Sequence, residues 1–300
     1  MGRQASISSR KQYGLARVCR VWEVARSSVY AWRERSQRRA SQSRRRPGPQ
    51  GPCSDGKLVA DVRKALKESP FHGEGYRKVW ARLRFKGIRT SKERVRPLMR
   101  EHGLQAPHRV GRPRGPAAHD GTITTERPNE MWGTDMTATV TIEEGQAAVM
   151  VAVDHCSFEC VGLHAAKSGN RFEALEPVRQ GVKERLGGVA PGAAVGLALR
   201  HDHGTAYLSD AFQGELAFLG MRSSPSFVRE PEGNGCAERF IRILKENLLW
   251  VRTFATVEEL RQALIEFKEQ YNRRWILQRH GYLTPRQAAE AAIRRLDEAA

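Results

Sequence analysis

The chain has 300 residues, with 51 Lys and Arg against 33 Asp and Glu, which gives a formal net charge of +18. The charge is uneven, because residues 1–114 carry +22 and the remainder carries −4. A basic section of this size indicates a polyanionic partner, most often nucleic acid, and the alternative is a merely cationic soluble surface. No run reaches the roughly 18 apolar residues of a membrane helix, and the N-terminus lacks the apolar core of a signal peptide. We therefore expect a cytoplasmic protein with no membrane partner.

The five cysteines, at 19, 53, 156, 160 and 236, form no paired framework, so they indicate a reducing compartment. One cluster, His155, Cys156, Cys160 and His164, has residue types that bind zinc. Its sequence alternates like two strands joined by a tight turn, so the four side chains would point to different faces. A zinc site is therefore the less favoured interpretation.

Residues 14–35 are typical of two short helices around a turn, within an N-terminal helix-turn-helix unit at 1–45. Ser27 or Ser28 would cap the second helix, and Val29 and Trp32 would share one face. Short helical units that never touch DNA have the same pattern. Residues 46–56, rich in Arg, Pro and Gly, are expected to form a linker.

Residues 57–107 predict a second helix-turn-helix module built from three helices. Thr90 and Glu93 form a possible capping box before the third helix, which Pro97 should kink or shorten. Four basic residues face outward on that helix, as a reader of the DNA major groove requires: Lys92, Arg94, Arg96 and Arg100. Each of the three helices has an apolar face. The first face consists of Leu58, Val62, Ala65 and Leu66, the second of Tyr76, Val79, Trp80 and Leu83, and the third of Val95, Leu98 and Met99.

After a second linker at 108–126, the pattern changes to strands. Three alternating runs span 131–142, 145–157 and 159–166, and the first two are separated by a hairpin signal. A helix near 170–186, a strand at 193–202, a helix near 208–219, a strand at 221–227 and a long helix from Cys236 complete the order. This order predicts an α/β domain with a mixed sheet and flanking helices.

Three carboxylates occur at distinctive points of this pattern. Asp202 lies in "LALRHDHGTAYLS", where it is either a turn residue or a metal ligand with partners elsewhere. Asp135 lies within a strand, where a charge is costly unless it is paired or bound to metal. Glu238 shares a helix stripe with Arg242 and Lys245, opposite an apolar face made of Cys236, Phe240, Ile243, Leu244 and Leu248.

The segments "WGTDMT", "RHDHGTAYLS" and "EGNGCAERFIRILKENL", with 35 residues between Asp202 and Glu238, resemble the D,D(35)E core of insertion-sequence transposases and retroviral integrases. The match is closest to the orfB-type transposases of two-frame insertion sequences. Residues 71–104 resemble that family's second helix-turn-helix module, and "YNRRWILQRHGYLTPRQA" at 271–288 resembles its C-terminal signature. The resemblance covers about residues 14–290. The histidine before Asp202, where the family more often has serine, and Pro97 are departures from its pattern.

The resemblance implies an RNase H-like core with a mixed five-stranded sheet at 127–290, followed by a tail at 291–300. It implies that Asp135, Asp202 and Glu238 are the catalytic residues and hold Mg²⁺, with two ions expected and Mn²⁺ as a substitute. The resemblance also implies that DNA is contacted by Lys245, Arg242 and Asn234. His201 and His203 are expected to be packing or supporting residues, because imidazole is a poor ligand for Mg²⁺.

The expected function is that of a DNA transposase that binds terminal inverted repeats, cleaves the 3′ ends and transfers the strand to target DNA. The expected partners are double-stranded DNA, other copies of the chain in a multimer and, as an open alternative, the product of an upstream reading frame. A catalytically silent DNA-binding repressor and a nuclease of the same fold remain as rival interpretations. The three acids argue against the first rival, and the two basic modules argue against the second.

Overall fold

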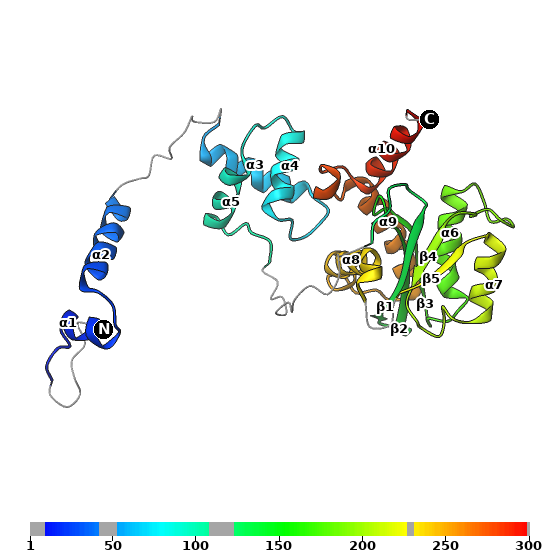
Figure 1. Cartoon of the computed structure of the whole chain (residues 1–300), viewed down its shortest axis with the longest axis horizontal. Helices are drawn as coiled ribbons and strands as arrows, with labels where there is room; N and C mark the ends of the chain where they lie inside the picture. The colour runs from blue at the N-terminus through cyan, green and yellow to red at the C-terminus, as the bar shows by residue number, and fades with distance from the viewer. Residues whose placement is uncertain (1–9, 42–52, 108–122, 227–230, 299–300) are drawn as a thin grey trace. The chain divides into compact units, whose positions relative to one another are not determined.

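The computed structural model describes residues 10–41, 53–107, 123–226 and 231–298, and the chain divides into two compact units between Gly51 and Pro52. Figure 1 shows the elements coloured along the chain. Most of the two expected linkers, 46–56 and 108–126, lies outside the described residues. None of the helices in the described ranges is long and apolar enough to cross a membrane.

The N-terminal unit consists of α1 (Leu15–Val21) and α2 (Arg26–Ser41), which confirms the two predicted helices. The expected serine cap is wrong, because α2 begins at Arg26 and the Val29 N–H already donates to Ala25 O. Among the described residues of this unit, Cys19 is the only buried hydrophobic side chain, and Trp32 is 68% exposed. This helix pair therefore has almost no core of its own.

The helical module contains α3 (Asp55–Glu68), α4 (Tyr76–Phe85) and α5 (Lys92–Glu101). Its buried cluster includes most of the residues that the periodicity predicted: Leu58, Val62, Ala65, Val79, Leu83, Val95, Leu98 and Met99. The predicted cap at Thr90 is wrong, since Ser91 Oγ accepts the Arg94 N–H at 3.1 Å. Pro97 lies inside α5, yet the helix continues to Glu101. The proline thus costs a backbone hydrogen bond without ending the helix.

The sheet domain (residues 123–226 and 231–298) is built on five strands in the order β3-β2-β1-β4-β5. The strands are β1 (Met131–Thr141), β2 (Gly145–Asp154), β3 (Cys160–Ala166), β4 (Ala198–His201) and β5 (Arg222–Pro225). β1, β2 and β3 are antiparallel, whereas β4 pairs parallel to β1 and β5 pairs parallel to β4. The fold is therefore the predicted mixed five-stranded, RNase H-like sheet. β4 is shorter than the apolar run 193–202, because Gly196 (φ +90°) belongs to a turn that precedes it.

Helices cover both faces of the sheet (Figure 1). Alternation along β2 sends Val149, Val151 and Val153 to the face covered by α8 (Gly235–Leu244) and α9 (Val257–Arg274). The other face packs against α6 (Glu176–Arg185) and α7 (Asp210–Leu219). Short 3₁₀ turns lie at Glu173–Leu175, Pro231–Asn234 and Gln278–His280. The last helix is α10 (Pro285–Asp297), which continues seven residues beyond the expected boundary at 290.

The expected long helix from Cys236 is interrupted, because α8 passes into a π-helical turn at Lys245–Leu249. The wider turn shifts the buried position by one residue. Leu249 is buried, and Leu248, which the sequence placed on the apolar face, is only half-buried. The remaining predicted face of this helix is confirmed by Cys236, Phe240, Ile243 and Leu244.

The helical module contacts the sheet domain through the loop between α3 and α4. Phe71 packs edge-on against Phe267 and Trp275 in the main core of the sheet domain. The His72 N–H donates to Asn247 Oδ1 at 2.7 Å, which ties this loop to the π-helical turn. The two parts share one compact unit through these contacts.

Candidate active site

Asp135 lies within β1, and Asp202 directly follows β4, the strand that pairs parallel to β1. Gly133 of β1 pairs with Arg200 of β4, and each aspartate lies two residues beyond its paired residue toward the carboxyl end. Because side chains alternate with a period of two, Asp135 lies on the same face as Gly133, and extending the register of β4 by one residue assigns Asp202 to that face as well. Asp135 also pairs with Val151, which belongs to the cluster under α8, so this is the face that α8 covers.

The start of α8 is fastened to β1 beside Asp135. Asn234, immediately before the helix, donates from Nδ2 to the Thr134 carbonyl at 2.8 Å. Glu238 follows Asn234 by four residues, about one helical turn, so it lies on the same side of α8. The expectation that Asn234 contacts DNA stays a prediction, and the structure gives this residue another role. Its side chain is only 5% exposed, and its amide holds the helix to the strand.

Gly133 makes this close approach possible. A Cβ atom at position 133 would lie 2.5 Å from Asn234 Oδ1 and 2.7 Å from Nε2 of His155. Real Cβ contacts are essentially never that short, so any larger residue would force the side chains of Asn234 and His155 to shift. The glycine in "WGTD" was the sequence signal for this contact, although its partners could not be read from the sequence.

The three acids and Lys245 influence one another electrostatically. Burial raises the pKa of Asp135 to about 6, and the Met136 N–H bond to its carboxylate opposes this rise. The charges of Asp202 and Glu238 raise this pKa further, and Lys245 lowers it. The charges of Asp202, Glu238 and Lys245 therefore all act on the ionisation of Asp135.

The three acids do not form a closed coordination cluster in the described residues, where no group of three His, Cys, Asp or Glu side chains is close enough to hold a metal ion. Asp202 Oδ1 accepts the Gly204 N–H at 2.8 Å, and Asp135 Oδ1 accepts the Met136 N–H at 2.8 Å. Both carboxylates thus bond to neighbouring backbone, as mutually repelling acids do. An all-oxygen donor set with mutual repulsion is chemically suited to a hard divalent cation such as Mg²⁺.

The zinc interpretation of the 155–164 cluster finds no support in the geometry. His155 Nδ1 contacts Ile123 O at 2.9 Å, and His164 Nε2 contacts Glu173 at 2.7 Å. The thiols of Cys156 and Cys160 point to Glu126 O and Gly162 O. The four side chains therefore have four separate sets of partners.

His201 supports Asp202 from the opposite face of the sheet. Its Nδ1 lies 2.7 Å from Asp202 O, and its Nε2 lies 2.8 Å from Ser223 Oγ. The ring is buried and stacks on Tyr207, and burial lowers its pKa. This confirms the expected packing role for His201.

The basic residues of α5 divide into two groups. Arg94 donates to Asp55 Oδ1 at 2.9 Å and to Cys53 O at 2.6 Å, and Lys92 Nζ lies 4.4 Å from the centre of the Trp80 ring. These two head groups are engaged within the protein. Arg96 and Arg100 are exposed and remain candidates for DNA contact. On α8, Arg242 is exposed as expected, and the exposed Arg239 is a further basic residue that the sequence analysis did not select.

The C-terminal signature holds the fold together. Tyr271 Oη donates to Phe158 O at 3.1 Å. Asn272 accepts the Cys160 N–H and donates to the Cys160 carbonyl, both at 2.9 Å, so it pairs with the start of β3 like a neighbouring strand. Thr284 forms a capping box with Gln287 at the start of α10.

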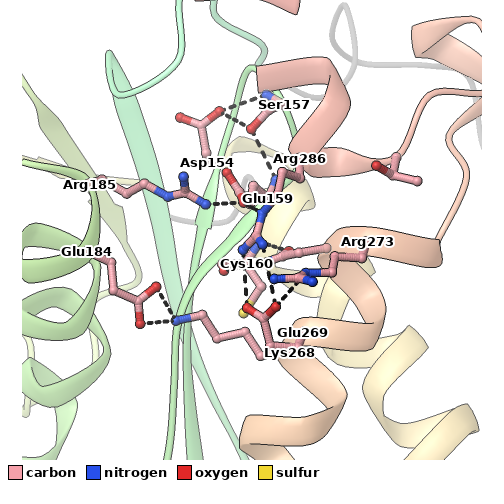
Figure 2. Close-up of polar contacts among 12 residues, drawn as sticks. Asp154, Ser157, Glu159, Cys160, Glu184, Arg185, Lys268, Glu269, Arg273 and Arg286 are labelled. Atoms are coloured by element: carbon pink, nitrogen blue, oxygen red, sulfur yellow. Dashed lines mark hydrogen bonds and ion pairs between the residues drawn. The ribbon is translucent and has the colours of Figure 1, made fainter. Parts of the chain in front are cut away.

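Figure 2 shows a polar network beside this junction that the sequence analysis missed. Glu159, 2% exposed, forms ion pairs with Arg185 of α6 and Arg286 of α10. Lys268 of α9 pairs with Glu184 at 2.8 Å. These pairs connect α6, α9 and α10 around β3, so they are structural.

Comparison with known proteins matches two parts of the chain to family models. A family model described as an HTH-like domain matches residues 55–112, and one described as an integrase core domain matches residues 219–285. Transposase InsD of the insertion element IS2A/D/F/H/I/K from Escherichia coli is 25% identical over 281 residues, covering 92% of this chain and 90% of its own length. The chain is a homologue of the insertion-element DNA transposases. The InsD transposase of element IS2-9 from Escherichia coli strain K12 matches this transposase homologue at the same identity, with 89% of its own length covered.

Solved structures similar to this transposase homologue include retroviral proteins. One is the simian T-cell lymphotropic virus intasome in complex with the PP2A regulatory subunit B56 gamma, with a TM-score of 0.46 and 19% identity over 79% of this chain and 74% of that one. Another is the HTLV-2 integrase catalytic core domain in complex with magnesium, with a TM-score of 0.41 and 20% identity over 54% of this chain and 97% of that one.

Proposed function

We propose that the chain cleaves the 3′ ends of an insertion element and joins them to target DNA, with Asp135, Asp202 and Glu238 as its catalytic carboxylates. The observation that carries this proposal is the placement of Asp135 on β1 and of Asp202 directly after the adjacent parallel strand β4, with the helix that bears Glu238 fastened to β1 beside Asp135. The influence of Asp202 and Glu238 on the pKa of Asp135 supports a shared site.

In this proposal, the three carboxylates hold Mg²⁺, with two ions expected and Mn²⁺ as a substitute. Such ions, when bound, stabilise the charge that develops on a phosphodiester during in-line displacement. The protein itself contributes by holding the three carboxylates in place. β1 and β4 hold the two aspartates in register, and the Asn234 to Thr134 hydrogen bond holds the helix that carries Glu238.

Two displacements at phosphorus would follow one another at this site. In the first, water attacks the phosphorus at the element end, the bond to the 3′ oxygen breaks, and that oxygen leaves as a hydroxyl. In the second, the freed 3′ hydroxyl attacks a phosphorus of the target, and the bond to the target's own 3′ oxygen breaks. Lys245 and Arg242 follow Glu238 along α8, where their charges would hold DNA phosphates.

The helical module would position the terminal inverted repeats through Arg96 and Arg100, with the N-terminal unit as a second basic contact. We further propose that several copies of the chain pair two DNA ends. An upstream reading frame would supply additional DNA-binding or oligomerisation segments in this proposal.

A plasmid-cleavage assay tests the proposed function. The purified chain is incubated with a supercoiled plasmid carrying the DNA that flanks its reading frame, with Mg²⁺ or with EDTA, and with or without the upstream-frame product. The proposal expects nicking and strand joining with Mg²⁺ and neither with EDTA. Binding of this DNA without cleavage under any of these conditions would instead support the silent repressor.

A further inference from the structure

A pocket of about 680 Å³ lies between the helical module and the segment after α8, apart from the three acids. Three aromatic residues line it: Tyr76 at the start of α4, Trp250 directly after the π-helical turn, and Trp275 directly after α9. Met99 of α5 contributes to the wall. Its volume lies within the range of about 300–1,000 Å³ that is typical of small-ligand sites.

Basic side chains lie close to two of these rings. The guanidinium groups of Arg77 and Arg96 each lie 5.6 Å from the centre of the Tyr76 ring. Lys78 Nζ is buried and covers the Trp275 ring at 2.8 Å from its centre, so the accessible positive charge beside the pocket comes from the two arginines. The pocket therefore combines aromatic faces with neighbouring cations, and Glu246 is the one acidic residue among those that line it.

The π-helical turn explains why Trp250 is available. It places Leu249 in the core and leaves Trp250 69% exposed at the pocket. Isolated π-helical turns within α-helices occur frequently at functional sites. Here the turn begins directly after α8, so one short segment connects the helix that carries Glu238 to the pocket.

A ligand for this pocket must suit both the rings and the cations. A purely apolar peptide would use the rings and leave the cations without counter-charge. A nucleotide offers a flat base for stacking and a phosphate for the cations, and stacking on aromatic side chains is the usual way that proteins bind unpaired bases. Part of the wall comes from Met99 of α5 and from the segment that follows α8, and the proposed function assigns DNA contacts to both helices.

We propose that this pocket stacks an unpaired nucleobase of the bound DNA, with Trp250 as its main stacking surface. The inference rests on the proposed function in one respect, namely that the chain binds DNA. It adds a preference for DNA that is locally unpaired over a fully paired duplex.

The test measures the affinity of the full chain for two DNA probes of the same duplex sequence. One probe is a blunt duplex, and the other carries a short unpaired extension that contains 2-aminopurine. We expect the wild type to bind the extended probe more tightly than the blunt one and to quench the 2-aminopurine fluorescence. Trp250→Ala should weaken binding of the extended probe by roughly 5- to 150-fold, which corresponds to about 1–3 kcal/mol per stacked base, and it should remove the quenching.

Trp250→Phe should retain most of the preference, because it preserves an aromatic face. Phe172→Ala is the matched control, since Phe172 is a similarly exposed aromatic side chain (61%) of the same domain outside the pocket. Equal affinity of wild type and Trp250→Ala for the extended probe, with blunt-duplex binding intact, would overturn the pocket and leave the proposed function standing. Absence of binding to either probe would overturn both.

Discussion

Asn234 donates its side-chain amide to the carbonyl of Thr134 at 2.8 Å and so joins the start of α8 to the residue immediately before Asp135. The two residues are 100 positions apart in the chain. This hydrogen bond places Glu238 over the face that carries both aspartates. The geometry of the three acids therefore depends on a contact in which none of them takes part.

Gly133→Ala tests that dependence. The added methyl group would lie 2.5 Å from Asn234 Oδ1, so the Asn234 side chain that fastens α8 to β1 must shift. We expect loss of most cleavage activity and a destabilisation of about 1–3 kcal/mol, measured by plasmid nicking and urea unfolding. Gly214→Ala is the matched control, because a Cβ atom there meets nothing within 4 Å in α7 and should stabilise the helix by about 0.5–1 kcal/mol. Full cleavage by Gly133→Ala would show that the spacing of α8 and β1 is not critical.

Asp135→Asn, Asp202→Asn and Glu238→Gln should each abolish cleavage and leave DNA affinity nearly unchanged. Each amide preserves size but removes a charged oxygen ligand. Nicking with Mg²⁺ and gel-shift affinity, measured on the same preparations, separate the two effects. Glu143→Gln, at an exposed carboxylate in the turn after β1, is the control that should cleave normally. Near-parental cleavage by any one of the three variants would remove that residue from the site.

Arg96→Ala and Arg100→Ala should weaken DNA binding and reduce its dependence on salt. Each lost phosphate contact should lower the slope of log affinity against log salt by about 0.9. Arg94→Ala should leave that slope nearly unchanged, because its guanidinium is already bound to Asp55 and to Cys53 O. Salt titrations of the full-length variants measure these slopes. A steeper loss for Arg94→Ala than for Arg96→Ala would reverse the assignment.

The free energy of unfolding should depend on pH through the ionisation of Lys78. Burial lowers its pKa from 10.5 to about 7; Glu74 opposes this shift, and Arg82 and Arg239 add to it. Between about pH 7 and 10.5 the unfolded chain binds this proton and the folded chain does not, so the contribution of this group to stability rises with pH. Lys78→Met should therefore stabilise the protein more at pH 6 than at pH 9.

The stabilisation by Lys78→Met should differ between pH 6 and pH 9 by about 1–3 kcal/mol. Each pKa unit corresponds to about 1.4 kcal/mol, and the Trp275 ring partly stabilises the ammonium. Urea unfolding at both pH values measures this difference. Lys64→Met is the control, since the Lys64 side chain is 72% exposed. An equal effect of Lys78→Met at both pH values would contradict a lowered pKa.

Asn272→Leu should destabilise the protein by about 3 kcal/mol, because it leaves the N–H and the carbonyl of Cys160 buried without their partners. Gln262→Leu on the same helix should change stability by less than about 0.5 kcal/mol, since Gln262 is exposed and bonds only to Glu258. Urea midpoints compare the two variants. Loss of cleavage by folded Asn272→Leu at low temperature would indicate a role beyond stability.

The sequence by itself determined the order and type of most elements. Alternation along 131–157 predicted the β1–β2 hairpin, and helical periodicity predicted the buried faces of α3, α4, α5 and most of α8. These features are local, because a strand or helix that buries one face must repeat apolar residues with its own period. The placement of Asp135 within a strand and of Asp202 at the end of an apolar run was readable for the same reason.

Only the tertiary structure decided which groups meet. The sequence assigned Asn234 and Arg94 to DNA, yet packing gives them Thr134 and Asp55 as partners. The π-helical turn that buries Leu249 and exposes Trp250 was also unreadable, because a shift of one residue in a helix is settled by the surface against which it packs. Periodicity reports that a face is buried, but it carries no information about what covers that face. Hydrogen-bond partners a hundred residues apart are chosen by the packing of whole elements.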